Sequence, residues 1–122
     1  MNTIRIENNQ HPLLSPLHVR YCDSFFCRLR GLMFRSQLPP EEGLLLVEAR
    51  ESRLDTSIHM LFVFMDLGVV WLDSSQMVVD IIVARAWRPV YTPCQPARYT
   101  LEIQPQRLNE FQIGDHLEFI HE

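Results

Sequence analysis

The residues best suited to chemistry in this sequence are the arginines of the segment Arg28–Arg35, which reads RLRGLMFR. Arg28, Arg30 and Arg35 stand at its start, near its middle and at its end. A guanidinium held beside a turn binds a carboxylate or phosphate through parallel hydrogen bonds. Such arginines more commonly hold the protein's own acidic groups, or favour a helix dipole from its C-terminal end. The segment therefore predicts either a ligand clamp or a structural network.

A glycine divides this segment and is followed by three large apolar residues. Gly31 indicates a bend in the backbone, of the kind that often needs positive φ. We expect Leu32, Met33 and Phe34 to be core residues, with the flanking arginines at the edge of the surface that they cover.

The other candidate binding residues are spread along the chain, so their convergence is a hypothesis. A carboxylate between arginines is ionised and strongly hydrogen-bonded, which suits a ligand site and an internal network equally. Trp87 and Tyr91 either line a site for a sugar or aromatic ligand, or pack against the sheet. We predict non-catalytic binding of a small anionic or carbohydrate-like ligand, or of a partner peptide, at an arginine-rimmed site. The candidate residues are Arg30, Arg35, His59, Asp66, Cys94, Arg98 and Glu102.

Cys94 has the surroundings of a nucleophile, because it lies in a proline-rich stretch near Arg98. A nearby guanidinium lowers the pKa of a thiol and favours the thiolate. Acyl transfer would also need a base such as His59. With no oxyanion-hole motif or orienting third residue, a Cys- or Asp/His-dependent hydrolase or transferase ranks behind binding and behind a scaffold for protein contacts. We assign no catalytic residue.

The chain has three cysteines, and Cys22, Cys27 and Cys94 cannot all pair within it. In a cytoplasmic protein we expect them to be reduced, as small core residues. No His/Cys cluster has the spacing of zinc ligands, so no metal or other cofactor is expected. All eleven basic residues are arginine, which excludes a Schiff-base lysine.

The length of 122 residues predicts one domain, 1–122. A net charge of -4 without a basic run argues against nucleic-acid binding. No apolar stretch approaches the ~20 residues of a membrane span, and the polar start of the chain does not resemble a signal peptide, so we expect a cytoplasmic protein. Its partner is an unknown small ligand or protein, and its oligomeric state stays open.

Alternation of apolar and polar residues predicts short strands. Residues 1–16 are expected to hold a peripheral edge strand and a loop, and the two runs around Asp73–Gln76 to form a hairpin. The expected strands are Thr3–Ile6, Leu17–Tyr21, Leu44–Val47, Ser57–Phe64, Val69–Leu72, Met77–Ala84, Arg98–Ile103 and His116–Ile120.

Two short helices complete the prediction. Asp23 is expected to cap a helix over Ser24–Leu29 that turns its phenylalanines and leucine inward, and Pro105 to begin one that continues over Gln106–Phe111. Most connections are too short for parallel crossovers. The predicted class is therefore α+β, mostly β: one domain with a curved, barrel-like, largely antiparallel sheet and one or two short helices.

Five ordered motifs resemble those of the UPF0127 (DUF192) family of small uncharacterised bacterial and archaeal proteins, over roughly residues 17–120. The resemblance implies the fold, a structural turn at Gly114-Asp115, and no reaction. The matching segments are Arg30–Arg35, His59-Met60, Val69–Asp73, Arg98–Glu102 and Ile113–Asp115.

The sequence departs from the family pattern in two strands. Gly43–Leu46 replaces G-M-L-F with another apolar run, and Asp66–Gly68 replaces P-L-D. The family's aspartate would fall on Gly68. Because a shift of two residues keeps the same face of a strand, Asp66 is a candidate substitute for that carboxylate. Export signals found in many relatives are not seen here, so their extracytoplasmic roles are not carried over.

Overall fold

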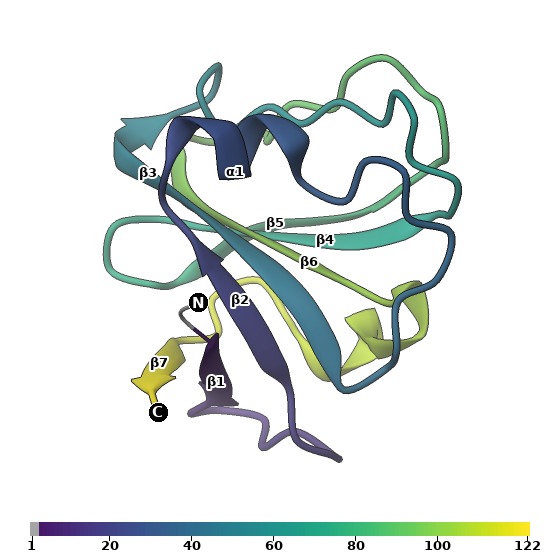
Figure 1. Ribbon diagram of the computed structural model, residues 1–122. Helices are drawn as coiled ribbons and strands as arrows, with labels where there is room; N and C mark the ends of the chain where they lie inside the picture. The colour runs from purple at the N-terminus through teal and green to yellow at the C-terminus, as the bar shows by residue number, and fades with distance from the viewer. Residues whose placement is uncertain (1–2) are drawn as a thin grey trace.

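Seven strands form one curled sheet in the computed structural model, which describes residues 3–122 (Figure 1). The order is β5-β4-β6-β3-β2-β1-β7, and among the described residues only β2 and β3 pair in parallel. The mostly β, largely antiparallel prediction is confirmed, with a sheet that curls but does not close. Residues 1 and 2 of the predicted domain lie outside the described residues. The strands are β1 (Thr3–Asn8), β2 (His18–Cys22), β3 (Glu42–Ser52), β4 (Leu67–Leu72), β5 (Val78–Ala84), β6 (Ala97–Ile103) and β7 (Leu117–His121).

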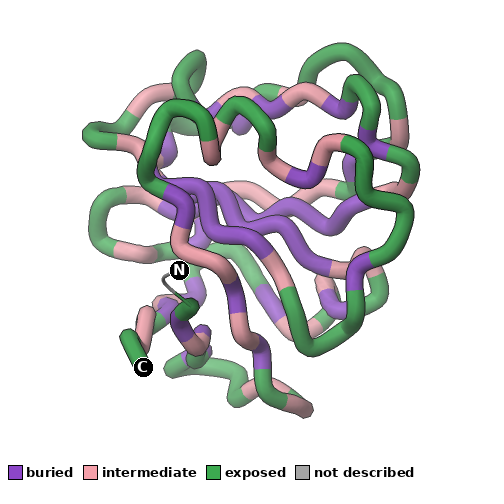
Figure 2. The backbone as a smooth tube through the Cα atoms, viewed as in Figure 1, coloured by how far each residue is buried: buried purple, intermediate pink, exposed green. Residues whose placement is uncertain are grey.

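Both faces of the sheet are buried, and alternation along the central strands assigns side chains to each face. On β6, Tyr99, Leu101 and Ile103 belong to the core inside the curl. Glu102 lies between them on the opposite face, which a layer of loops covers. Figure 2 shows the central strands buried and the short helix above them largely exposed. The core on this second face includes Leu44, Leu46, Val69 and Trp71.

The helix α1 (Phe25–Arg30) buries none of its residues. Ser24, rather than the expected Asp23, is its N-cap and accepts a hydrogen bond from the Cys27 backbone N–H at 3.2 Å. The prediction that Phe25, Phe26 and Leu29 turn inward is wrong, because all three are exposed. The sheet face below them is already filled by residues of the covering loops, namely Leu32, Ile58 and Met60.

Two predicted strands differ in the structure. Ser57–Phe64 is a series of turns with a single bridge from Ile58 to Tyr91, since Phe62 takes a φ of 60° that no strand allows. β1 is not a peripheral edge strand, because it pairs with both β2 and β7. The expected hairpin is confirmed as β4 and β5, and the helix after Gln104 is the 3-10 helix η1 (Pro105–Glu110).

The two edges of the sheet approach each other at one end. Met77 and His116 form an isolated antiparallel bridge. Beside it, the Val78 N–H donates to the Asp115 carbonyl at 2.8 Å, and the Gly114 N–H donates to the Val78 carbonyl at 2.8 Å. The start of β5 is therefore joined to the turn before β7. No helix within residues 3–122 is long and apolar enough to cross a membrane.

The buried guanidinium of Arg107 joins η1 to two loops at the base of the sheet. Its Nη1 donates to the carbonyls of Pro16 at 3.0 Å and Pro40 at 2.9 Å, and its Nη2 donates to that of Ser15 at 2.8 Å. The Glu110 carboxylate accepts from Nε at 2.7 Å and from Nη2 at 2.9 Å. These hydrogen bonds lower the pKa of Glu110. Every contact of this side chain is internal, so it holds the fold and not a ligand.

Replacing Arg107 by Ala is expected to lower the free energy of unfolding by about 3–5 kcal/mol, because a buried carboxylate and three carbonyls lose their donor. Urea denaturation measures the change. The control is Arg50→Ala, whose side chain is 83% exposed and 3.8 Å from Asp55. This control should stay within about 0.5 kcal/mol of wild type. Equal effects of the two substitutions would contradict the role of Arg107.

Candidate functional site

A small cavity lies where the end of α1, the loop 53–66 and the centre of the sheet meet. Its volume is about 50 Å³, enough for one or two water molecules or a small polar group. Apolar residues from two strands, α1 and two loops form much of its wall. Its polar and charged lining residues are Arg28, Arg30, Ser57, His59 and Glu102. We call this space the Glu102 cavity.

Glu102 reaches the cavity because of its place in the sheet. It pairs with Leu44 of β3 on one side and with Val69 of β4 on the other. The residue is 4% exposed, and its carboxyl has no hydrogen-bond partner among residues 3–122. Burial raises the pKa of Glu102 to about 7. A carboxyl in the middle of an apolar sheet is thus left facing a cavity.

His59 also lines this cavity and carries a second polar atom without a hydrogen-bond partner in the described part of the chain. Its Nε2 lies 3.1 Å from the Leu29 carbonyl. Because a carbonyl only accepts, Nε2 carries the hydrogen, and Nδ1 of the neutral ring is an acceptor. Nδ1 is buried without a hydrogen-bond partner in the described part of the chain. Two residues of the lining, His59 and Glu102, therefore each carry a polar group without a partner among residues 3–122.

Gly31 forms part of the cavity wall and brings the chain out of α1. Its φ of 50° with ψ of -125° confirms the predicted bend, and this region of backbone space is open to glycine almost alone. A side chain here would begin 4.0 Å from the Glu102 Oε1 atom. Arg30, just before it, is exposed, and its guanidinium has no ion pair or hydrogen bond with residues 3–122. Arg30 is thus a free cation at the mouth of the cavity.

An apolar groove of about 500 Å³ adjoins the cavity and shares Leu29, Arg30, Met33 and His59 with it. The rest of its lining is Phe26, Phe34, Leu61 and Phe62. The prediction that the three residues after Gly31 are core residues holds for Leu32, which is buried. It is wrong for Phe34, which is 63% exposed, because the left-handed backbone at this residue turns the ring outward to the groove.

Aromatic rings continue from the groove across the surface. Phe34 lies 5.5 Å from Phe62, and Phe62 lies 5.1 Å from Trp87, which lies 5.6 Å from Phe64 (centroid distances). Phe34, Phe62 and Trp87 have φ values of 66°, 60° and 66°. Bulky residues rarely adopt this conformation, and it is found most often at functional sites. We call the four residues whose rings are in contact, Phe34, Phe62, Trp87 and Phe64, the aromatic row.

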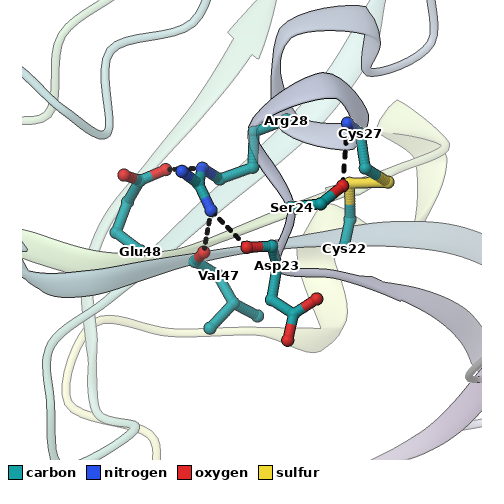
Figure 3. The surroundings of a disulfide bond; sticks show 7 residues. All are labelled: Cys22, Asp23, Ser24, Cys27, Arg28, Val47 and Glu48. Carbon is teal, nitrogen blue, oxygen red and sulfur yellow. Dashed lines mark hydrogen bonds and ion pairs between the residues drawn. A yellow bond between two sulfur atoms is a disulfide. The ribbon is translucent and has the colours of Figure 1, made fainter.

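Figure 3 shows how α1 is attached to the sheet. Cys22, at the end of β2, forms a disulfide with Cys27 in α1, so the prediction that these cysteines are reduced is wrong. Arg28 forms an ion pair with Glu48 at 2.7 Å and donates to the Val47 carbonyl at 3.2 Å. The helix that ends at the cavity is therefore held by the disulfide, by Arg28 and by the contact of His59 with the Leu29 carbonyl, rather than by a buried face.

The remaining candidate residues lie apart from the cavity. Arg98 donates from Nε to the Glu48 carbonyl at 2.9 Å and lies over the Tyr99 ring. Arg35 donates to the Gln37 carbonyl at 3.3 Å. The structure thus brings together Arg30, His59 and Glu102, and does not bring the other arginines to the same rim.

Asp66 joins the ends of the β4–β5 hairpin. It accepts from the Ala86 N–H at 2.9 Å and from Arg85 at 2.8 Å, and these contacts lower its pKa. Gly68 packs so closely that an added Cβ would lie 2.8 Å from the Leu108 side chain. An aspartate at position 68 would therefore not fit this packing.

Cys94 lies on the exposed side of β5. Loss of solvent around the thiol and the nearby Asp80 carboxylate raise the pKa of Cys94, the opposite of what a nucleophile needs. Its N–H donates to Asp80 at 2.9 Å. Within residues 3–122, no group of three or more His, Cys, Asp or Glu side chains is arranged to hold a metal ion.

The Gly114-Asp115 turn, which the family resemblance implied to be structural, makes internal contacts. Gly114 has a φ of 94°. Asp115 is buried and accepts from Asn8 at 2.8 Å, from the Gln112 N–H at 2.9 Å, and pairs with His11 at 2.9 Å. Burial alone would raise the pKa of Asp115, but these hydrogen bonds lower it overall. The turn fixes β7 against β1.

Comparison with known proteins identifies similar sequences. The profile of DUF192, described as "Uncharacterized ACR", matches residues 4–119. A UPF0127 protein of Thermococcus gammatolerans is 47% identical over 85 residues, which cover 70% of this chain and 54% of the relative. A UPF0127 protein of Pyrococcus furiosus is 38% identical over 106 residues, which cover 84% of this chain and 87% of the relative. The chain spans about half the length of the Thermococcus gammatolerans protein and of a UPF0127 relative from Thermococcus kodakarensis.

A solved structure has the same architecture. It comes from Sinorhizobium meliloti 1021 and is described as that of a candidate transcription regulator. The TM-score is 0.83 at 20% identity, over 97% of this chain and 92% of the other. At this identity the likeness shows the fold alone.

The buried carboxyl predicts that stability falls as pH rises. The folded state keeps the Glu102 proton up to about pH 7, whereas an unfolded glutamate loses it near its ordinary value of 4.5. In this window the unfolded state binds fewer protons, so the free energy of unfolding decreases, by about 3 kcal/mol in total. Urea denaturation at about pH 5 and at about pH 8 measures this decrease, and the Glu102→Gln variant should not show it. Parallel losses in wild type and variant would contradict an unpaired buried carboxyl.

Because the Cys22–Cys27 disulfide attaches α1 to the sheet, its reduction is expected to release the helix. Dithiothreitol treatment, or replacement of Cys22 and Cys27 by serine, should lower the free energy of unfolding by about 2 kcal/mol, because a short closed loop loses its cross-link. Hydrogen exchange should rise in residues 23–31, where no helical side chain is buried. Cys94→Ser is the matched control and should leave both measurements unchanged. An unaltered melting temperature after verified reduction would argue against the tether.

Proposed function

Since this chain belongs to the DUF192 (UPF0127) family, whose description assigns no reaction, we propose its function from its own site: non-catalytic binding of a small ligand with an apolar body and an anionic group. The apolar body lies in the groove beside Phe34 and Phe62. The anionic group contacts Arg30 at the mouth of the Glu102 cavity. This proposal retains the anion contact that was expected from several arginines, but assigns it to Arg30 alone.

The observation that carries the proposal is the strained, exposed aromatic surface. Left-handed backbone at a bulky residue costs on the order of 1–3 kcal/mol, and glycine would remove that cost. Phe34 and Phe62 retain it while exposing their rings to water. A feature that costs stability and adds no core packing is typical of a binding surface.

Arg30 supplies the polar half of the recognition. Arg28 is neutralised by Glu48, and the other candidate arginines donate to backbone carbonyls. A free guanidinium beside an apolar groove favours a ligand that carries a carboxylate or phosphate next to its apolar part. The raised pKa of Cys94 and its distance from the cavity lining give no support to a thiol-dependent hydrolase.

A thermal-shift titration tests the proposal with 3-phenylpropionate as the probe. We expect a saturable rise in melting temperature, because the probe offers a ring to the groove and a carboxylate to Arg30. In Arg30→Ala and in Phe62→Ala, the probe concentration that gives half of the maximal shift should rise at least about tenfold. This change corresponds to a loss of about 1.4 kcal/mol in binding free energy.

Arg50→Ala is the matched control, since Arg50 is an exposed arginine outside the groove. It should bind the probe like wild type. A panel of glucosides and of short peptides serves as the second arm, because a sugar or a peptide could also use the aromatic rings. No saturable shift with any probe, or an equal shift in Arg30→Ala, would overturn the proposal.

A further inference from the structure

We infer that the Glu102 cavity binds a primary ammonium group, so that the ligand of the site proposed above carries an amine beside its apolar part. The inference rests on that proposed site for the position of the apolar part. It goes beyond it by assigning a chemical group to the space beneath the groove.

Glu102 is the one buried residue among the polar and charged residues that line the cavity in the described part of the chain. The Glu102 carboxyl and the buried Nδ1 of His59 both lack partners among residues 3–122. The Nε2–H of His59 is already used by the Leu29 carbonyl. An ammonium has three N–H donors and no acceptor, so it pairs with the Glu102 carboxylate and brings no acceptor that would stay unsatisfied. An anion would meet a carboxylate of its own charge instead.

Size and surroundings favour the same group. A space of about 50 Å³ admits an ammonium and its first methylene but not a guanidinium with its stem. The strand neighbours of Glu102 are Leu44 and Val69, so water competes little for the carboxylate. A buried carboxylate is costly unless it is paired with a cation.

The other charged groups around the cavity do not supply that cation. Arg28, from α1, is committed to Glu48 and to the Val47 carbonyl. Arg30 is exposed at the mouth, where it also lines the groove. His59, from the loop 53–66, and Glu102, from β6, complete the titratable lining. A ligand with an ammonium group in the Glu102 cavity and an anionic group at Arg30 is a zwitterion. An apolar amino acid has both groups, and the first residue of a peptide supplies the ammonium.

Binding is expected to release a proton. The amine enters already charged, and Glu102 changes from the carboxylic acid to the carboxylate as the ion pair forms. Its proton passes to the buffer, and no covalent bond in the ligand changes. Near pH 6 most of the free protein holds this proton, because burial raises the pKa of Glu102 to about 7. Near pH 8.5 little of it does, so release should vanish there.

Isothermal titration calorimetry measures this release with 2-phenylethylamine, in two buffers of different ionisation enthalpy. We expect nearly one proton released per amine near pH 6 and almost none near pH 8.5. The matched alcohol 2-phenylethanol should bind at least about tenfold more weakly. The Glu102→Gln variant, checked for folding by circular dichroism, should no longer bind 2-phenylethylamine but should still bind 3-phenylpropionate.

The outcomes separate the two proposals. Binding of 3-phenylpropionate through Arg30, with no binding of the amine, would overturn the ammonium site and leave the proposed function standing. Failure of all three probes would overturn both. Amine binding without proton release near pH 6, or unchanged in Glu102→Gln, would also overturn the assignment. A peptide that begins with phenylalanine and its N-acetylated form extend the test: weaker binding after acetylation supports recognition of the amine and identifies a peptide end as a source.

Discussion

The contact on which the architecture depends is the buried guanidinium of Arg107 and its hydrogen bonds to loop carbonyls. The chain has eight prolines, which donate no backbone hydrogen bond, and its irregular segments leave carbonyls that need donors. Arginine offers five N–H groups in a rigid fork. Arg53 and Arg98 make the same kind of contact, to the carbonyls of Pro93 and Glu48. Several of the arginines, which are the only Lys or Arg residues in this sequence, thus hold the fold together by donating to backbone carbonyls.

That internal use explains the form of the proposed binding surface. The other candidate arginines donate to backbone carbonyls, whereas within residues 3–122 Arg30 has no partner and the Glu102 carboxyl is not paired with a cation. The covering layer rests on loops and a disulfide-held helix rather than on a packed helical face. Disulfides are rare in a reducing cytosol outside hyperthermophiles, so the Cys22–Cys27 bond does not support the cytoplasmic location expected from the sequence.

The sequence predicted the sheet far better than the site. Alternating strands such as β6 and the β4–β5 hairpin were readable because each buries a regular face. The turns over Ser57–Phe64 carry the same alternation, yet Phe62 and Phe64 point to solvent, and no local pattern distinguishes this case. His59 and Glu102 were among the candidates, but only the fold shows that they share a cavity. Phe26 and Leu61 escaped notice because exposed apolar side chains read as core residues.

The bridge between Met77 and His116 affects how another molecule can approach. Strands at the open margin of a sheet invite a foreign backbone to pair with them, which is a common route both to peptide capture and to aggregation. Here the margins of β5 and β7 are tied to one another at one end, so neither presents its full length as a template. This bridge shortens the margin that is open to a foreign strand, which favours the proposed recognition through side chains of the covering loops over extension of the sheet.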